Sequence, residues 1–343
     1  MKNIDCLLAL VLAVVIIPSQ AKAQFQGGRV VEDRETFRIG LTAGTIFGLD
    51  GEVRETTRPF YELQGRGAPP ENYSWDELGF DDSFVAYGFF MEKMWRYITL
   101  QTRLFHGVPE LSGTADRDYY IGVGGVNFNG REYDYLKIPR GTSYSGELDI
   151  YALNLNMRIT PFSIGNDDYF VEFVPWIHVG LFGFLGDYVI DVGRASGVVQ
   201  YENPPRDYVV GGRATGTSGL VVPELGLGGE FRFFLTDGAT LHLGGNIAFL
   251  NFDGNTSDFG ISSRNEKDLE LDYVTVSGRL LLEIALNDRM NLLLGVELQS
   301  WTAEAESRAS AKTEEEIREL REKFDKDISL EMSSIMGLVG LSF

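Results

Sequence analysis

The sequence predicts an all-β protein, a transmembrane antiparallel up-and-down β-barrel of about ten strands. Apolar residues alternate with small or polar ones in segments of roughly ten residues or more, the length that a tilted strand needs to cross a bilayer. The connections between these segments alternate strictly between short and long. Glycine is abundant, at 40 residues, and aromatic residues make up 12% of the chain, which favours many strands over a helical bundle.

Each alternating segment has one apolar face and one mixed face. In the ninth segment, Leu292, Leu294 and Val296 share one face. Glu297 and Gln299 share the opposite face, as expected for a strand between lipid and lumen. The segments lie near 36–48, 83–93, 96–107, 148–160, 169–187, 219–234, 240–252, 271–286, 290–302 and 328–343.

The lengths of the connections favour a membrane barrel over a soluble sandwich, because outer-membrane barrels combine short periplasmic turns with long outer loops. An even number of strands also places both termini in the periplasm. Two long loops contain strand-like pieces, Tyr119–Asn127 and Tyr208–Ala214, which we expect to be hairpin extensions above the membrane. If they cross the membrane instead, the strand number is twelve. The short turns lie near 93–95, 161–168, 236–239 and 287–289, and the long loops span 49–82, 108–147, 188–218, 253–270 and 303–327.

The N-terminus has the pattern of a cleaved signal peptide. Lys2 precedes an apolar run, and Ala21-Lys22-Ala23 offers the small residues that signal peptidase accepts. We therefore expect residues 1–23 to be removed after Ala23 and residues 24–343 to form a single barrel domain. The only cysteine, Cys6, lies in the removed part, so the mature chain is expected to have no disulfide.

The C-terminus, Val339-Gly340-Leu341-Ser342-Phe343, resembles the terminal strand signal of bacterial outer-membrane β-barrel proteins. The resemblance implies a location in the outer membrane, contact with its lipids and lipopolysaccharide, and recognition of Phe343 by the barrel-assembly machinery. It covers the mature chain as a pattern, matches no specific subfamily and implies no activity.

The inward-facing positions carry many charges. In an antiparallel hairpin, the residue numbers of any two opposed positions add up to the same total, which is set by the centre of the turn. This rule predicts that Arg158 faces Glu172 and that Arg279 faces Glu297. A charge in a partly dry lumen needs a partner, because an unpaired one would cost several kcal/mol. The other polar residues expected in the lumen are Arg38, Glu92, Arg103, Glu224, Glu230, Arg232, Glu283, His178 and His242.

Two interpretations of this charged lumen stay open. The charges form either a salt-bridge ladder that fills a narrow barrel or a polar path that conducts ions. With an acidic outer mouth, the second favours a narrow porin-like passive channel for ions or small solutes. The alternative function is a surface-exposed structural or adhesion barrel that binds an unidentified extracellular partner through its acidic loops. The net charge of −20 argues against nucleic acid as a partner.

We expect neither an enzyme nor a bound metal or cofactor. His106 is expected to face outward, and His178 and His242 to make hydrogen bonds inside the lumen, so they do not converge as metal ligands. Omptin-like proteases combine aspartate pairs with an Asp–His pair at the outer rim. The Asp81–Asp82 pair is present, but no rim loop places a histidine beside an aspartate.

The last outer loop differs from the others because it has a helical pattern. Thr313 and Glu316 resemble a capping box, and Ile317, Leu320 and Phe324 follow at helical spacing. We expect a short amphipathic helix near 313–326.

Overall fold

The computed structural model describes residues 35–55, 72–95, 97–121, 126–133, 135–166, 170–198, 208–209, 211–255, 267–309 and 326–343. The predicted signal peptide (1–23) lies outside these ranges, as does the predicted helix near 313–326 apart from its last residue. Every regular element within them is a β-strand. None of the ranges contains a helix long and apolar enough to cross a membrane.

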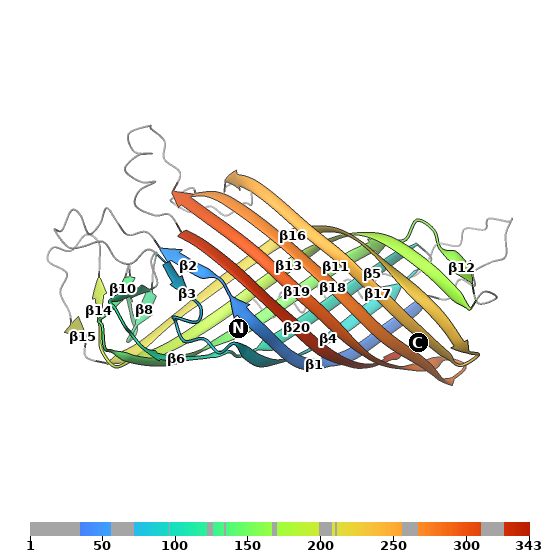
Figure 1. Cartoon of the computed structure of the whole chain (residues 1–343), viewed down its shortest axis with the longest axis horizontal. Coiled ribbons are helices and arrows are strands. Elements are labelled where there is room, and N and C mark those ends of the chain that lie inside the picture. The colour runs from blue at the N-terminus through green and yellow to red at the C-terminus, as the bar shows by residue number, and fades with distance from the viewer. Residues whose placement is uncertain are drawn as a thin grey trace.

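Long antiparallel strands form the main sheet (Figure 1). Their pairing order is β13-β11-β5-β4-β1-β20-β19-β18-β17-β16, and β16 pairs in turn with β13, so the pairing returns to its starting strand. The strands are β1 (Thr36–Asp50), β4 (Ser83–Met94), β5 (Ile98–Gly107), β11 (Ser143–Ile159), β13 (Val171–Val192), β16 (Gly212–Thr236), β17 (Ala239–Asn255), β18 (Lys267–Asn287), β19 (Met290–Ala309) and β20 (Lys326–Ser342).

Shorter strands lie mostly at one end of the sheet, which we call the platform end, whereas β12 lies at the opposite, turn end (Figure 1). Four of them form a separate sheet in the order β15-β14-β10-β7. The short strands are β2 (Glu52–Glu55), β3 (Asn72–Ser74), β6 (Glu110–Thr114), β7 (Tyr119–Ile121), β8 (Val126–Phe128), β9 (Arg131–Tyr133), β10 (Tyr135–Ile138), β12 (Ile164–Asn166), β14 (Ala195–Val198) and β15 (Tyr208–Val209).

Each predicted alternating segment overlaps one long strand, but several strands continue well beyond the expected ends. β13 has 22 residues and β16 has 25, about twice the 9–11 that a tilted membrane strand needs. The strand-like piece Tyr119–Asn127 is divided between two short strands, and its second part forms a hairpin, because β8 pairs with β9. β7 pairs with β10 in the small sheet, whereas β8 pairs with β16 and β9, so the two halves of that piece belong to different sheets.

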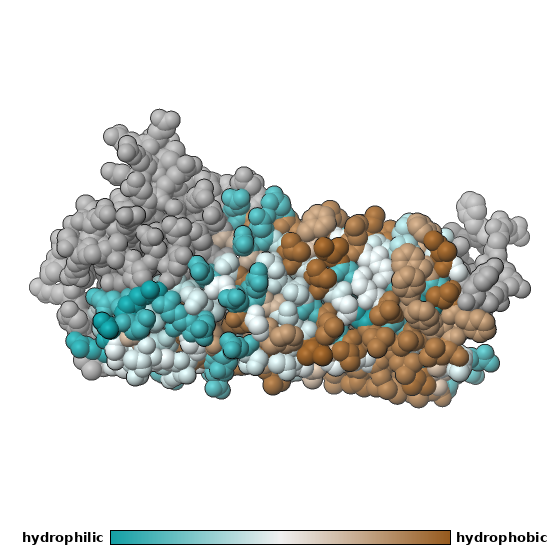
Figure 2. Space-filling model, in the orientation of Figure 1, coloured by the Kyte–Doolittle hydropathy of each residue, from teal (hydrophilic) through white to brown (hydrophobic). Residues whose placement is uncertain are grey.

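The outward face of the long strands exposes large apolar side chains. Leu41 is 65% exposed, Val85 69% and Leu227 56%, and similar residues occur on every long strand. In Figure 2 apolar surface dominates toward the turn end, and hydrophilic surface gathers toward the platform end. A soluble monomer rarely exposes a contiguous apolar patch of more than a few hundred Å².

The first and last long strands, β1 and β20, pair with each other in the sheet. The N–H of Phe343 donates to the carbonyl of Phe37 at 2.9 Å, and the N–H of Phe37 donates back at 3.1 Å. On the inward face, the ring of Phe90 lies over glycines of both strands. A Cβ atom on Gly40 would lie 2.6 Å from the Phe90 ring, and one on Gly340 would lie 3.1 Å from it.

The described residues form three clusters of buried apolar side chains. Two lie inside the ring of long strands, one formed by Phe90, Leu281, Leu293 and Leu338 and the other by Ile46, Phe84, Ala86 and Met336. The third, which we call the platform core, packs the short strands onto the ends of β11, β13 and β16. It consists of Tyr73, Leu111, Ala115, Tyr119, Phe128, Tyr133, Leu136, Ile138, Tyr144, Val192, Ala195 and Ala214.

Candidate functional site

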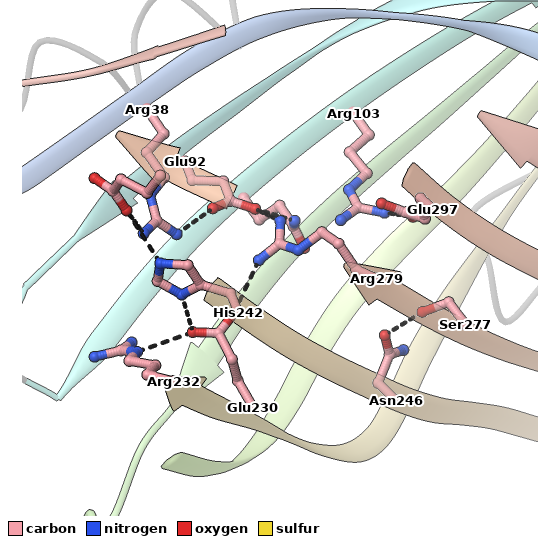
Figure 3. A network of polar contacts seen from close by, with 12 residues as sticks. Arg38, Glu92, Arg103, Glu230, Arg232, His242, Asn246, Ser277, Arg279 and Glu297 are labelled. Carbon is pink, nitrogen blue, oxygen red and sulfur yellow. Dashed lines mark hydrogen bonds and ion pairs between the residues drawn. The ribbon is translucent and has the colours of Figure 1, made fainter. Parts of the chain in front are cut away.

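A network of ion pairs crosses the interior between strands that are not neighbours in the sheet (Figure 3). Arg38 on β1 lies 2.6 Å from Glu283 on β18 and 3.6 Å from Glu92 on the adjacent β4. Gln101 on β5 donates to Glu92 at 2.6 Å, and Asn291 on β19 donates to Glu283 at 2.6 Å. The carboxylates therefore join opposite parts of the wall.

Arg279 forms the centre of this network. One of its Nη atoms lies 2.6 Å from Glu92 on β4, and the other lies 3.4 Å from Glu230 on β16. The register places Arg279 opposite Glu297, as predicted, but Glu297 forms its ion pair with Arg103 on β5. The two residues lie opposite each other as predicted, but each forms its ion pairs with other residues.

His242 lies between two carboxylates. Its Nδ1 is 3.0 Å from Glu230, and its Nε2 is at an ion-pair distance of 3.2 Å from Glu283. Arg232, directly opposite His242 in the register, lies 2.9 Å from Glu230 and 3.2 Å from Glu172. His242 is therefore buried and hydrogen-bonded to a carboxylate.

The predicted Arg158–Glu172 pair is wrong. Arg158 lies opposite His178 in the register, and Glu172 lies opposite Arg232. The connection after β11 is longer than a simple turn, because it contains β12, which pairs with the first residues of β13. With this connection, the residue numbers of opposed positions on β11 and β13 add up to six more than the predicted total, since Ile159 lies opposite Ile177.

A second polar group lies farther from the turn end. Glu224, which is 2% exposed, accepts hydrogen bonds from Tyr273 at 3.1 Å and from Asn154 at 2.7 Å. Beside it is a cavity of about 20 Å³, lined partly by Arg103, Arg158 and His178. His178 is buried, but neither ring nitrogen has a hydrogen-bond partner within the described ranges, contrary to the expectation from the sequence.

Inside the ring of long strands, the carboxylates of Glu92, Glu230 and Glu297 are buried, as are two of the apolar clusters. Across the described part of the chain, no group of three or more His, Cys, Asp or Glu residues is arranged to hold a metal ion.

Sequence reasoning missed the contact between His106 and Asp149. His106 Nε2 lies within hydrogen-bond distance of the Asp149 carboxylate, on the outward face near the platform end. The rings of Tyr87 and Tyr151 flank the imidazole, with centroids 4.9 and 4.5 Å away. The β5–β11 register brings these residues together, but a long loop separates the two strands in sequence, so no turn indicates that register.

An open groove of about 670 Å³ lies at the platform end. Its polar lining includes the ion pair between Asp191 and Arg213, with atoms 3.1 Å apart, and the hydroxyl groups of Ser143 and Ser145. Asn129, at the turn between β8 and β9, has a positive φ of 51° and accepts the N–H of Arg213 at 3.0 Å. The groove thus joins the platform to the ends of the long strands.

No protein-family model and no curated protein sequence matches the chain. Among solved structures, the outer membrane protease OmpT from Escherichia coli is similar over 90% of this chain and 96% of its own, with 9% identity and a TM-score of 0.35. The translocator domain of the autotransporter NalP from Neisseria meningitidis gives 10% identity, a TM-score of 0.24 and coverage of 90% and 88%. A FadL homologue from Pseudomonas aeruginosa has 8% identity and a TM-score of 0.22, and the match covers 91% of this chain and 90% of the homologue. These values are too low to assign an activity or a substrate.

Proposed function

We propose that the chain is an exported bacterial outer-membrane protein in which the ten long strands form a closed transmembrane barrel. The apolar side chains exposed on every long strand support this proposal, because lipid is the solvent in which such a band is stable. The two-way hydrogen bonds between Phe37 and Phe343 support closure, since they leave neither terminal strand with a free edge.

The barrel serves as a closed anchor that presents the platform outside the cell. The observation that carries this proposal is the cross-lumen ion pair between Arg38 and Glu283, with its neighbours at Glu92 and Arg279. Eight-stranded barrels are already filled by their side chains, and ten strands add little width. A lumen crossed by ion pairs and packed with leucine and phenylalanine leaves no continuous path for a solute.

The platform has the features of a binding module. It has its own hydrophobic core, in which Phe128 and Leu136 are fully buried, so it presents a fixed surface. The groove beside it carries hydroxyl, carboxylate and guanidinium groups, which suit a polar extracellular partner. Surface binding was the alternative function expected from the sequence.

The narrow channel stays the competing function, and the polar cavity beside Arg158 is the feature that favours it. We do not propose an enzymatic function.

Surface labelling tests the proposed orientation. The mature chain carries no cysteine, so single substitutions give a clean signal. Arg140→Cys lies in an exposed turn of the platform, and Asp237→Cys lies in the exposed β16–β17 turn at the other end. A membrane-impermeant maleimide added to intact cells should label Arg140→Cys and leave Asp237→Cys unlabelled until the cells are broken. Labelling of Asp237→Cys alone on intact cells would reverse the proposed topology.

A further inference from the structure

The middle of the lumen contains a guanidinium group without a carboxylate partner. Arg158 stacks on the ring of Trp176, 4.6 Å from its centroid, and its Nε atom has no hydrogen-bond partner. Within the ranges that the structure describes, no carboxylate forms an ion pair with Arg158. Every other lumen arginine among the predicted site residues has at least one such partner.

The neighbours of Arg158 are unpartnered as well. His178 lies opposite Arg158 in the register, is 1% exposed, and has no partner at either ring nitrogen. Trp301 is buried, and its Nε1 also has no partner. All three residues line the cavity of about 20 Å³.

The register explains how these residues come to share one cavity. Starting at His178, successive partners are Gly226 on β16, Ala248 on β17 and Thr275 on β18, and the row ends at Trp301 on β19. The small side chains in the middle of the row leave room for the two ring systems. A Cβ atom on Gly226 would lie 2.4 Å from the His178 ring, so the glycine lets the imidazole lie against the wall.

Glu92 attracts Arg158 electrostatically but makes no ion pair with it, because Glu92 is held by Arg279, and the carboxylates nearer the cavity are engaged as well. Glu224 accepts hydrogen bonds from Tyr273 and Asn154, and Glu297 pairs with Arg103. Buried polar groups in native proteins are almost always satisfied, by protein atoms, by water or by an ion. A buried cation without a counter-charge costs several kcal/mol.

We propose that this cavity is a binding site for a small monovalent anion of the size of chloride. Guanidinium and indole groups only donate hydrogen bonds, so they suit a ligand that accepts from several directions. A cavity of about 20 Å³ holds a single water-sized species, since one water needs roughly 10–15 Å³ on this measure. The bound anion supplies the counter-charge of Arg158 and fixes the middle of the lumen.

Anion-dependent unfolding tests the site. The full-length mature chain is refolded in detergent, and its urea midpoint is measured as chloride replaces the bulky anion gluconate at constant ionic strength. The midpoint should rise with chloride and saturate. Arg289→Gln removes an exposed arginine in the β18–β19 turn, outside the lumen, and should keep this response, whereas Arg158→Gln should lose it. A response that is absent, or equal in both variants, would overturn the proposal.

Crystals grown with bromide give a second result that does not depend on the variant folding. Anomalous scattering should show a bromide peak within hydrogen-bond distance of the Arg158 guanidinium. Density for water alone at that place, or bromide only at the protein surface, would overturn the site. Both tests are independent of which side of the membrane the platform faces, so failure here leaves the proposed function intact.

Discussion

Arg38 and Glu283 form an ion pair of 2.6 Å although they are 245 residues apart in sequence. Their strands, β1 and β18, are separated in the sheet by β20 and β19. The pair therefore spans the interior instead of running along the wall between neighbouring strands. Both side chains have little exposure, at 4% and 13%.

Removing the charge of Arg38 should destabilise the barrel. In Arg38→Gln, Glu283 and Glu92 lose a buried cationic partner, which typically costs about 3–5 kcal/mol. The urea midpoint of the refolded protein should fall accordingly. Lys93→Gln is the matched control, because the Lys93–Glu35 pair is exposed, and such pairs contribute about 0–1 kcal/mol. Equal effects of the two substitutions would show that the Arg38 pair is not buried.

The packing of Phe90 on glycine should be sensitive to one added methyl group. In Gly40→Ala, the new Cβ would lie 2.4 Å from the carbonyl oxygen of Val339 as well as close to the Phe90 ring. Overpacking of this kind costs about 1–3 kcal/mol. In Gly278→Ala the added atom meets nothing within 4 Å, so the free energy of unfolding should be nearly unchanged. A neutral Gly40→Ala would contradict a filled lumen at this level.

The platform core should be separable from the barrel. Leu136→Ala removes a fully buried side chain, at an expected cost of about 2–5 kcal/mol. Limited proteolysis should then cut the platform while the long strands stay resistant. Arg140→Ala, on the platform surface, should leave the cleavage pattern unchanged. Loss of resistance along the whole chain in Leu136→Ala would mean that the two parts fold as one unit.

Acid should loosen the platform through Asp118. Burial alone raises the pKa of Asp118, but hydrogen bonds from Lys137 and from the N–H of Arg140 outweigh it and hold the pKa below the usual 3.8. A lowered pKa in the folded state means that Asp118 stabilises the platform above its unfolded pKa and stops doing so as the pH falls through the folded value. Proteolysis with an acid protease should accelerate below about pH 4 in the wild type. Asp118→Asn should lack this change, and an unchanged pH profile would remove Asp118 as its source.

Much of the main sheet could be predicted from the sequence, because period-two alternation directly reflects that the two faces of a strand have different surroundings. The placement of Arg279 opposite Glu297 followed from a tight turn with a clear centre. The Arg158–Glu172 prediction failed where the connection holds an extra short strand, β12, which no composition signal marks.

The partners across the lumen could not be predicted in the same way. The rule for residue numbers in a hairpin relates only strands that pair with each other. The contact between Arg38 and Glu283 depends instead on how the ring of strands curves. The inward apolar residues were also missed, because Leu281 and Leu293 lie within runs of leucine whose outward members already explained the pattern. The platform core was missed because it gathers short strands from several loops.

Planar-bilayer recording of the refolded mature chain tests the central claim most directly. The cross-lumen ion pairs and apolar clusters predict that membranes containing the protein show no conductance steps above background, in either polarity. Reproducible single-channel steps from the wild-type protein would contradict a closed lumen and favour the narrow channel.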